Sequence, residues 1–144
     1  MYLVKEIDIK QYEDCFKLDS ESLNIWNKNQ WESEFKKKGV KVFGIYNQEN
    51  EIIGLTSIQL IAFEIQINFL SIKIGYREKG LGRELVNHIL NYSKQFKVER
   101  IFLEVSNKNK PALRFYESFG FNTLYIRKNY YKDGSDAILK EKKL

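Results

Sequence analysis

The chain has 144 residues, of which 43% are hydrophobic and 15% aromatic, and its formal net charge at neutral pH is +5. A chain of this length and composition can bury one hydrophobic core, so we expect a single domain over residues 1–144 and exclude a disordered chain. Its one cysteine, Cys15, and one histidine, His88, exclude an internal disulfide and are too few for a tetrahedral zinc site. We therefore expect a reduced protein without bound metal, located in the cytoplasm.

Neither the N-terminus nor any later stretch predicts association with a membrane. Residues 1–8 lack the long apolar segment of a secretory signal. The most apolar stretch, residues 52–74, is interrupted by polar side chains and cannot span a bilayer. The positive charge favours an acidic partner such as a phosphate-bearing cofactor, but the chain has no arginine-rich run. We expect no membrane partner and no direct binding of nucleic acid.

The first elements along the chain are a strand and two helices. Alternating apolar and polar residues at 1–9 predict an edge strand. Residues 11–38 predict helix in two pieces, and Asn27 or Asn29 is the expected N-cap of the second. Gly39 marks its end, because cations stabilise a helix C-terminus and glycine commonly follows the last turn.

A β-meander is predicted for the next stretch. Two apolar runs, residues 40–46 and 52–61, are separated by turn-forming residues. The third strand, residues 65–74, changes its apolar parity between Phe69 and Leu70. Such a change predicts either a β-bulge or a strand buried on both faces.

The second half of the chain alternates helix and strand before it ends in two strands. Leu81, Leu85 and Ile89 recur at helical spacing and predict a helix. The expected elements are a helix at 80–96, a buried strand at 100–105, a helix at 111–119, and strands at 121–126 and 137–141. The order β-αα-βββ-α-β-α-ββ predicts a mixed α/β fold.

A glycine-rich loop joins the third strand of the meander to the helix that follows. Its sequence, residues 75–83, is GYREKGLGR. The first N–H groups of a helix are unpaired and carry partial positive charge, so a pyrophosphate can bind there, and glycine at 80 and 82 lets it approach. Positive charge is added by Arg77, Lys79 and Arg83. Taken alone, the pattern is equally consistent with a structural turn.

A second segment makes the assignment specific. Residues 103–121 have the sequence LEVSNKNKPALRFYESFGF. Together, R-x-x-G-x-G at 77–82 and L-E-V-x-x-x-N-x-x-A-x-x-F-Y-x-x-x-G-F resemble the acetyl-coenzyme A core of the GCN5-related N-acetyltransferases, the GNAT superfamily. The resemblance implies a central, mostly antiparallel twisted sheet that splays around the acetyl-coenzyme A site, flanked by about four helices. It also implies acetyl transfer from acetyl-coenzyme A to an amine.

The end of the chain narrows the resemblance. Residues 127–131 and 133–137 resemble the R-x-N-Y-Y and D-G-x-D-A patterns of RimI-type ribosomal-protein-alanine N-acetyltransferases. Trp26 resembles a tryptophan early in that family, although Ile25 replaces the preceding proline. Gly75 also stands where relatives usually have proline. These departures bear on the identity of the substrate more than on the chemistry.

The resemblance implies two catalytic residues, Glu104 as base and Tyr116 as acid. A free α-amine has a pKa of about 8 and must lose one proton before it attacks a thioester. Strand alternation directs Glu104 away from the packed face, although it could equally be an ion-pair partner of Arg100 or Lys108. Tyr116 could hydrogen-bond or protonate the leaving thiolate, or it could be a core aromatic residue.

The remaining expected site residues bind the two substrates. The resemblance implies that acetyl-coenzyme A contacts the strand backbone, the phosphate loop and one asparagine: Leu70, Ser71, Ile72, Arg77, Glu78, Lys79, Gly80, Leu81, Gly82, Arg83 and Asn109. Asn109 could also be a helix N-cap. Candidates for acceptor binding are Trp26, Glu64, Tyr130 and Tyr131, for each of which a packing or surface role is an alternative.

We therefore predict an acetyl-coenzyme A-dependent N-acetyltransferase acting on a protein N-terminus, with the N-terminal alanine of a small-subunit ribosomal protein as the expected target. One alternative is acetylation of a small amine or a lysine side chain. Others are a coenzyme A-binding domain without catalysis and an enzyme that acts on charged RNA.

Overall fold

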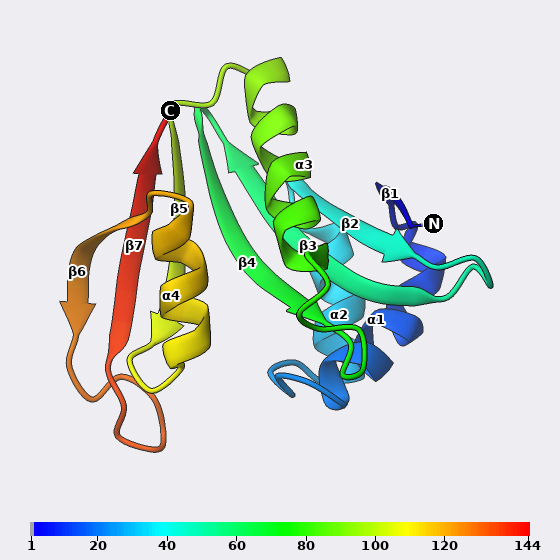
Figure 1. Ribbon diagram of the computed structural model, residues 1–144, viewed down its shortest axis with the longest axis horizontal. Coiled ribbons are helices and arrows are strands. Elements are labelled where there is room, and N and C mark those ends of the chain that lie inside the picture. The colour runs from blue at the N-terminus through cyan, green and yellow to red at the C-terminus, as the bar shows by residue number, and fades with distance from the viewer. Residues whose placement is uncertain (1) are drawn as a thin grey trace.

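Seven strands form one twisted sheet in the order β1-β2-β3-β4-β5-β7-β6 (Figure 1). The computed structural model describes residues 2–144. The strands are β1 (Leu3–Glu6), β2 (Val40–Tyr46), β3 (Ile52–Ile61), β4 (Glu64–Ile72), β5 (Arg100–Ser106), β6 (Asn122–Arg127) and β7 (Ala137–Lys143). All neighbouring strands are antiparallel except β4 and β5, which are parallel. The predicted mixed α/β fold with a mostly antiparallel sheet is confirmed.

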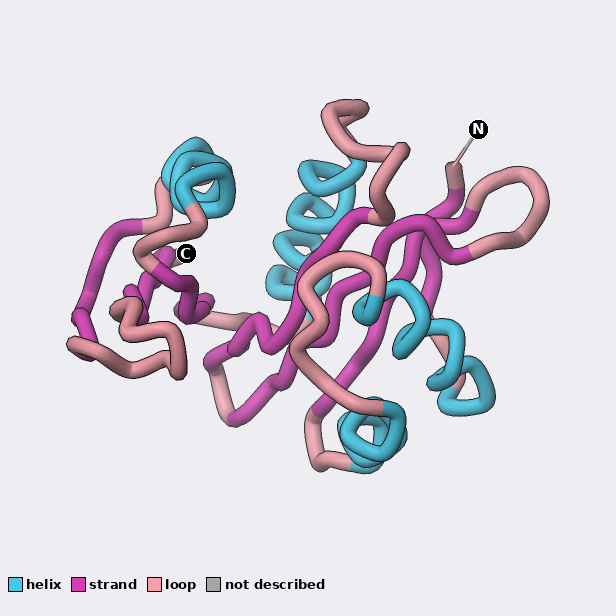
Figure 2. The backbone as a smooth tube through the Cα atoms, turned by 90° about the horizontal axis from the view of Figure 1, so that it is seen from below, coloured by secondary structure: helices cyan, strands magenta, loops and turns pink. Residues whose placement is uncertain are grey.

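Helices cover both faces of the sheet. Helices α1 (Tyr12–Ser20) and α2 (Lys28–Lys36) pack on one face, and α3 (Leu81–Gln95) and α4 (Lys110–Ser118) lie on the other (Figure 2). A short 3-10 helix (Ile9–Gln11) precedes α1. No helix within residues 2–144 is long and apolar enough to cross a membrane.

The two helical pieces predicted for residues 11–38 are both present, and local side chains fix the start of the second. Asn27 is the N-cap of α2 and accepts a hydrogen bond from the backbone N–H of Gln30, whose side chain accepts from the Asn27 backbone N–H in return. This capping box pairs two otherwise free donors, and it selects Asn27 over Asn29. Gly39 follows with a φ of +81°, where a side chain would collide with the Leu60 carbonyl.

The parity change in β4 is a β-bulge. Ile58 on β3 pairs with Ile67, whereas its neighbour Ser57 pairs with Phe69, so Asn68 is the extra residue. The bulge lies one residue before the predicted position. It turns Ile67 towards the α3 face and Phe69 towards α1 and α2, because one extra residue reverses the side-chain alternation.

The core has a layer on each side of the sheet. Between the sheet and α3 and α4, Ile67, Leu103 and Ile89 belong to one buried cluster. On the other face, Trp31 is fully buried among residues of α1, β2 and β4. Residues on β5 alternate strictly between buried and partly exposed, so the apolar residues predicted to share its packed face do so.

Candidate active site

A cleft opens where β4 and β5 part. The two strands are paired over only four residues each, ending at Ile67 opposite Leu103, and then diverge (Figure 1). Beyond that point each strand keeps a hydrogen-bonded neighbour on its outer side only, β3 for β4 and β7 for β5. The cleft between them has a volume of about 280 Å³ and receives side chains from both strands, from α4 and from two loops. The sheet thus presents backbone groups without a strand partner to a ligand-sized space.

Glu104 lies on β5, one residue beyond the last paired position, and its side chain faces the cleft. Its Oε2 atom is buried and accepts no hydrogen bond from any residue within 2–144. The Nε atom of Arg127 lies 3.4 Å away, close enough for an ion pair but without hydrogen-bond geometry. A buried carboxylate oxygen without a hydrogen bond is costly, so this atom is suited to receive a donor from a bound molecule.

Tyr116 enters the cleft from α4 and is the buried residue of that helix. Its ring packs edge-on against Phe115 and Phe121, at centroid distances of 5.1 and 5.6 Å. Burial raises the pKa of the Tyr116 hydroxyl well above its usual value, so the phenol stays protonated at neutral pH. A thiol has a pKa near 8.5, so this hydroxyl is a better hydrogen-bond donor to a thiolate than a source of a fully transferred proton.

The predicted pantetheine-binding strand has the expected open edge. Leu70 lines the cleft, whereas Ser71 and Ile72 are buried and pair with β3. The Nε atom of Arg77 donates to the Ile72 carbonyl at 3.0 Å. Arg77 therefore ties the start of the glycine-rich loop to the end of β4 as well as adding positive charge.

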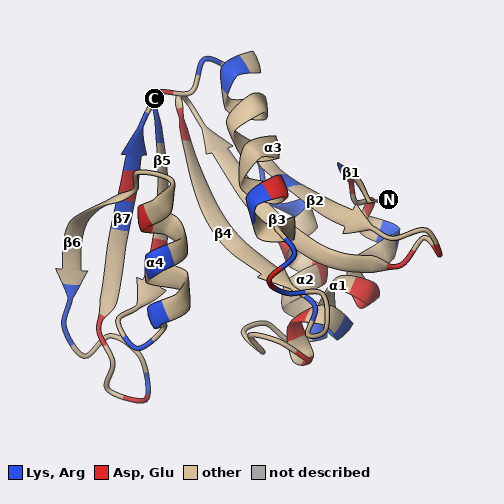
Figure 3. Cartoon of the chain, viewed as in Figure 1, with Lys and Arg blue, Asp and Glu red and all other residues tan. Residues whose placement is uncertain are grey.

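The glycine-rich loop leads into an uncapped helix start. Gly75, Glu78 and Gly80 all have positive φ, and Gly80 is the N-cap of α3 with no side chain bonded to the helix N–H groups. A chain bent in this way directs successive N–H groups outward and forms an anion-binding concavity. Leu81, the first residue of α3, is buried beneath it. Figure 3 shows basic residues along this loop.

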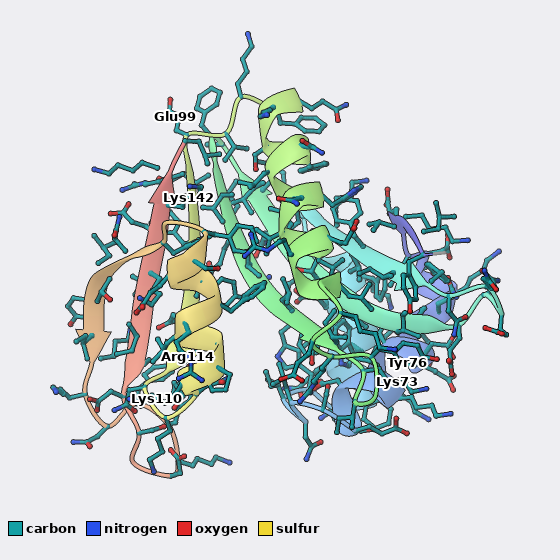
Figure 4. All side chains as sticks on the ribbon, in the orientation of Figure 1. Lys73, Tyr76, Glu99, Lys110, Arg114 and Lys142 are labelled. Carbon is teal, nitrogen blue, oxygen red and sulfur yellow. The ribbon has the colours of Figure 1, made fainter. Side chains whose placement is uncertain are left out.

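Side chains around this helix start add charge and fix its position. A Cβ atom at Gly82 would lie 3.2 Å from the Phe115 ring, so glycine here lets α3 approach α4 closely. Arg83 lies over the Phe119 ring at 4.4 Å, and Lys79 lies 5.6 Å from the Tyr76 ring. Figure 4 labels two further basic residues, Lys110 and Arg114, on α4.

Two expected residues reach the cleft on turns that the structure builds locally. Asn109 lines the cleft and also caps α4, because its Oδ1 accepts from the Ala112 backbone N–H at 3.2 Å. Tyr131 lies in the loop between β6 and β7 and also lines the cleft. The pKa of its hydroxyl is raised by burial first and by the negative charge of Glu104 second. Tyr130 packs edge-on against Tyr131 but is itself exposed.

The aspartates of the D-G-x-D-A segment hold the Tyr131 loop. Asp136 accepts from the backbone N–H of Asn129 at 2.9 Å, and Asp133 accepts from both the hydroxyl and the backbone N–H of Ser135. These hydrogen bonds lower the pKa of both carboxyls, because they stabilise the charged form. The segment acts on the cleft by shaping the loop that carries Tyr131.

Two expected acceptor-binding residues lie outside the cleft. Glu64 begins β4, at the paired end of the two strands, where it forms an ion pair with Arg100. Trp26 packs against Trp31 and Phe69 in the core, at ring distances of 4.8 and 5.7 Å. Neither is among the side chains that line the cleft.

Three lining residues were not expected from the sequence: Leu23, Ile25 and Asn68. The first two lie in the loop between α1 and α2 and are 40% and 53% exposed. Two large apolar residues in a loop were the available signal for them, because such residues are usually buried. For Asn68 the signal was a polar residue at the parity change of β4.

The comparisons agree with this geometry. The model of the acetyltransferase (GNAT) family matches residues 2–121. The chain is 34% identical to the Escherichia coli [ribosomal protein bS18]-alanine N-acetyltransferase over 64% of each chain. It is 27% identical to a Bacillus subtilis protein provisionally named for the same activity, over 94% of this chain and 91% of that protein.

Solved structures give the same result. The E. coli ribosomal-protein-S18-alanine N-acetyltransferase superimposes with a TM-score of 0.90 at 25% identity, over 98% of this chain and 92% of that one. Arabidopsis thaliana NAA60 in complex with acetyl-CoA superimposes with a TM-score of 0.89 at 16% identity, over 100% and 99% of the two chains.

Proposed function

This chain belongs to the acetyltransferase (GNAT) family, and on that premise we propose that the acceptor of its acetyl group is the α-amine of a protein N-terminus. It is an acetyl-coenzyme A-dependent N-acetyltransferase. The proposed target is the N-terminal alanine of a small-subunit ribosomal protein, in agreement with the names of its relatives. Acetylation of a ribosomal protein would place the enzyme in the cytoplasm, and we propose that residues 1–144 form one domain.

The observation that carries the proposed chemistry is the free oxygen of Glu104. A buried carboxylate oxygen without a hydrogen bond faces a cleft whose other lining includes the Tyr116 hydroxyl. In this proposal Glu104 accepts one proton from the bound ammonium group and leaves a neutral amine. The amine nitrogen then forms a bond to the thioester carbon. As the carbon–sulfur bond breaks, the Tyr116 hydroxyl donates a hydrogen bond to the departing sulfur.

The two substrates would approach from opposite faces of the sheet. The glycine-rich loop and the start of α3 offer an anion site on the α3 face, which suits the pyrophosphate of acetyl-coenzyme A. Loop residues Leu23, Ile25 and Tyr131 form a largely apolar rim, which suits the first residues of a peptide. An apolar rim without a carboxylate favours a peptide start over a polyamine, which carries several positive charges.

The test is release of coenzyme A from acetyl-coenzyme A and a short peptide that begins with alanine. We expect rapid release by the wild type, and little release by Glu104→Gln or with the same peptide blocked at its N-terminus. Spermidine and a peptide carrying only a lysine side-chain amine are the comparison acceptors. Turnover of either of these, with none on any free peptide N-terminus, would reject the proposed acceptor and leave the acetyltransferase assignment intact.

A further inference from the structure

A buried carboxylate lies behind the acceptor side of the cleft. Glu34, on α2, is only 1% exposed. Its Oε2 accepts hydrogen bonds from the Ser57 hydroxyl at 2.7 Å and from the Asn68 side-chain amide at 2.9 Å, while Oε1 lies 2.9 Å from the Lys37 ammonium. Burying a charge is costly unless it is fully hydrogen-bonded, so this group demands a structural or functional reason.

Asn68 connects that carboxylate to the cleft. It is the bulged residue of β4, and it lines the cleft next to the point where β4 and β5 part. An ionised carboxylate can only accept hydrogen bonds, so Asn68 must present its NH2 group to Glu34. The Asn68 carbonyl oxygen is thereby turned away from Glu34. It forms no hydrogen bond within residues 2–144 and is not among the buried unpaired atoms, so it is exposed in the cleft.

The register places Asn68 opposite Glu104. Ile67 and Leu103 form the last pair of β4 and β5, and both face the α3 side. The next residue on each strand is Asn68 or Glu104, and side chains of successive residues point to opposite faces. Asn68 reaches α2 and Glu104 lies beside Arg127, so both side chains are on the face away from the anion site. Two hydrogen-bond acceptors therefore flank the apex of the cleft on one face.

We propose that the Asn68 carbonyl oxygen, oriented by Glu34, binds the acceptor amine together with Glu104. A primary ammonium group has three N–H bonds, so it can donate one to each acceptor and be held before it loses its proton. Asn68 would then be a binding residue for the acceptor and Glu34 a positioning residue. This inference rests on the proposed function for the identity of the amine, but the geometry applies to any primary amine that this site acetylates.

The test is steady-state kinetics of Asn68→Leu, which keeps the side-chain volume and removes the carbonyl. We expect the KM for the alanine peptide to rise about tenfold, the effect of losing one hydrogen bond to a charged group, with the KM for acetyl-coenzyme A unchanged. Gln66→Leu is the matched control, because it removes an exposed side-chain amide from the same strand outside the cleft. A peptide KM within twofold of the wild type, or an equal rise in both KM values, would overturn the proposal.

Two variants of Glu34 separate positioning from folding. Glu34→Gln keeps an oxygen that can accept from Asn68, so the peptide KM should stay within about threefold of the wild type. Glu34→Leu frees Asn68 and should reproduce the Asn68→Leu kinetics if the variant folds, as checked by circular dichroism. A tenfold loss in the Gln variant would contradict the positioning role. If the wild type acetylates only a small primary amine, the proposed function fails, and the same variants then test Asn68 with that amine.

Discussion

The two walls of the cleft are held in different ways. The β4 wall is backed by α1 and α2, where Trp31 is fully buried and the carboxylates of Asp19 and Glu34 are hydrogen-bonded within the core. The β5 wall is thinner: every residue of β6 is exposed, and Tyr116 is the buried residue of α4. Yet Glu104 and Tyr116, the proposed acid–base pair, both belong to this second wall. Most of the packing energy is therefore on one side and the chemistry on the other.

This comparison also explains the loop between α1 and α2. Asp19 is fully buried and accepts three hydrogen bonds at 2.9 Å, from the backbone N–H groups of Ile25 and Trp26 and from the Trp31 indole. The hydrogen bonds fix the loop that brings Leu23 and Ile25 to the cleft. The well-packed wall thus shapes the acceptor side without taking part in proton transfer. Mutations in the two walls should separate stability from activity.

The largest expected effect is on activity, in the thin wall. Glu104→Gln should lower kcat about 10²–10⁴-fold, because an amide cannot accept the amine proton, while the melting temperature stays close to that of the wild type. Coenzyme A release and thermal melting measure the two quantities. Glu117→Gln, at an exposed carboxylate on α4, is the matched control. Equal activity losses in both variants would remove Glu104 from the chemistry.

The next effect is on stability, in the packed wall. Trp31→Ala should lower the free energy of unfolding by about 3–5 kcal/mol, through lost burial and a cavity. Tyr125→Ala on β6, where the side chain is 58% exposed, should change it by about 0.5 kcal/mol or less. Urea denaturation followed by circular dichroism compares them. A Tyr125 effect as large as that of Trp31 would contradict the difference between the walls.

A smaller effect is expected at the phosphate loop. Gly80→Ala should cost about 1–2 kcal/mol of stability, because φ is +80° at this position and a side chain is strained there although space around it is open. The KM for acetyl-coenzyme A should rise while the KM for the acceptor stays constant. Gly134→Ala provides a control, since Gly134 also has positive φ and open space but lies in the β6–β7 loop. It should show the stability loss without the change in KM for acetyl-coenzyme A.

The smallest effect is a pH dependence of stability. The pKa of Tyr116 is raised in the folded protein, so above pH 10 the unfolded chain loses this proton first. The stabilisation contributed by this group is fully present below about pH 10 and is lost as pH rises beyond it. Tyr116→Phe should therefore show a shallower loss of stability between pH 9 and 11, as measured by urea midpoints. An unchanged slope would mean that Tyr116 ionises as easily in the fold as in the unfolded chain.

Local signals in the sequence determined most of the fold and the chemical class. Helical and strand periodicities gave every element to within a few residues, because each depends on side chains that are close along the chain. The predicted strand at 1–9 is shorter, Leu3–Glu6, and Met1 lies outside the described residues. The placement of Glu104 on the free face of its strand also followed from alternation alone.

Only the tertiary structure decided which residues meet in the cleft. Glu64 and Leu70 share one strand, but the divergence of β4 from β5 begins between them, so one pairs with Arg100 and the other lines the cleft. Trp26 turned inward because Asp19 fixes its loop, and Ile25 turned outward in its place. The pairing of Asn68 with Glu34 joins residues 34 positions apart. These outcomes depend on strand register and on the docking of helices, which a pattern within one segment does not encode.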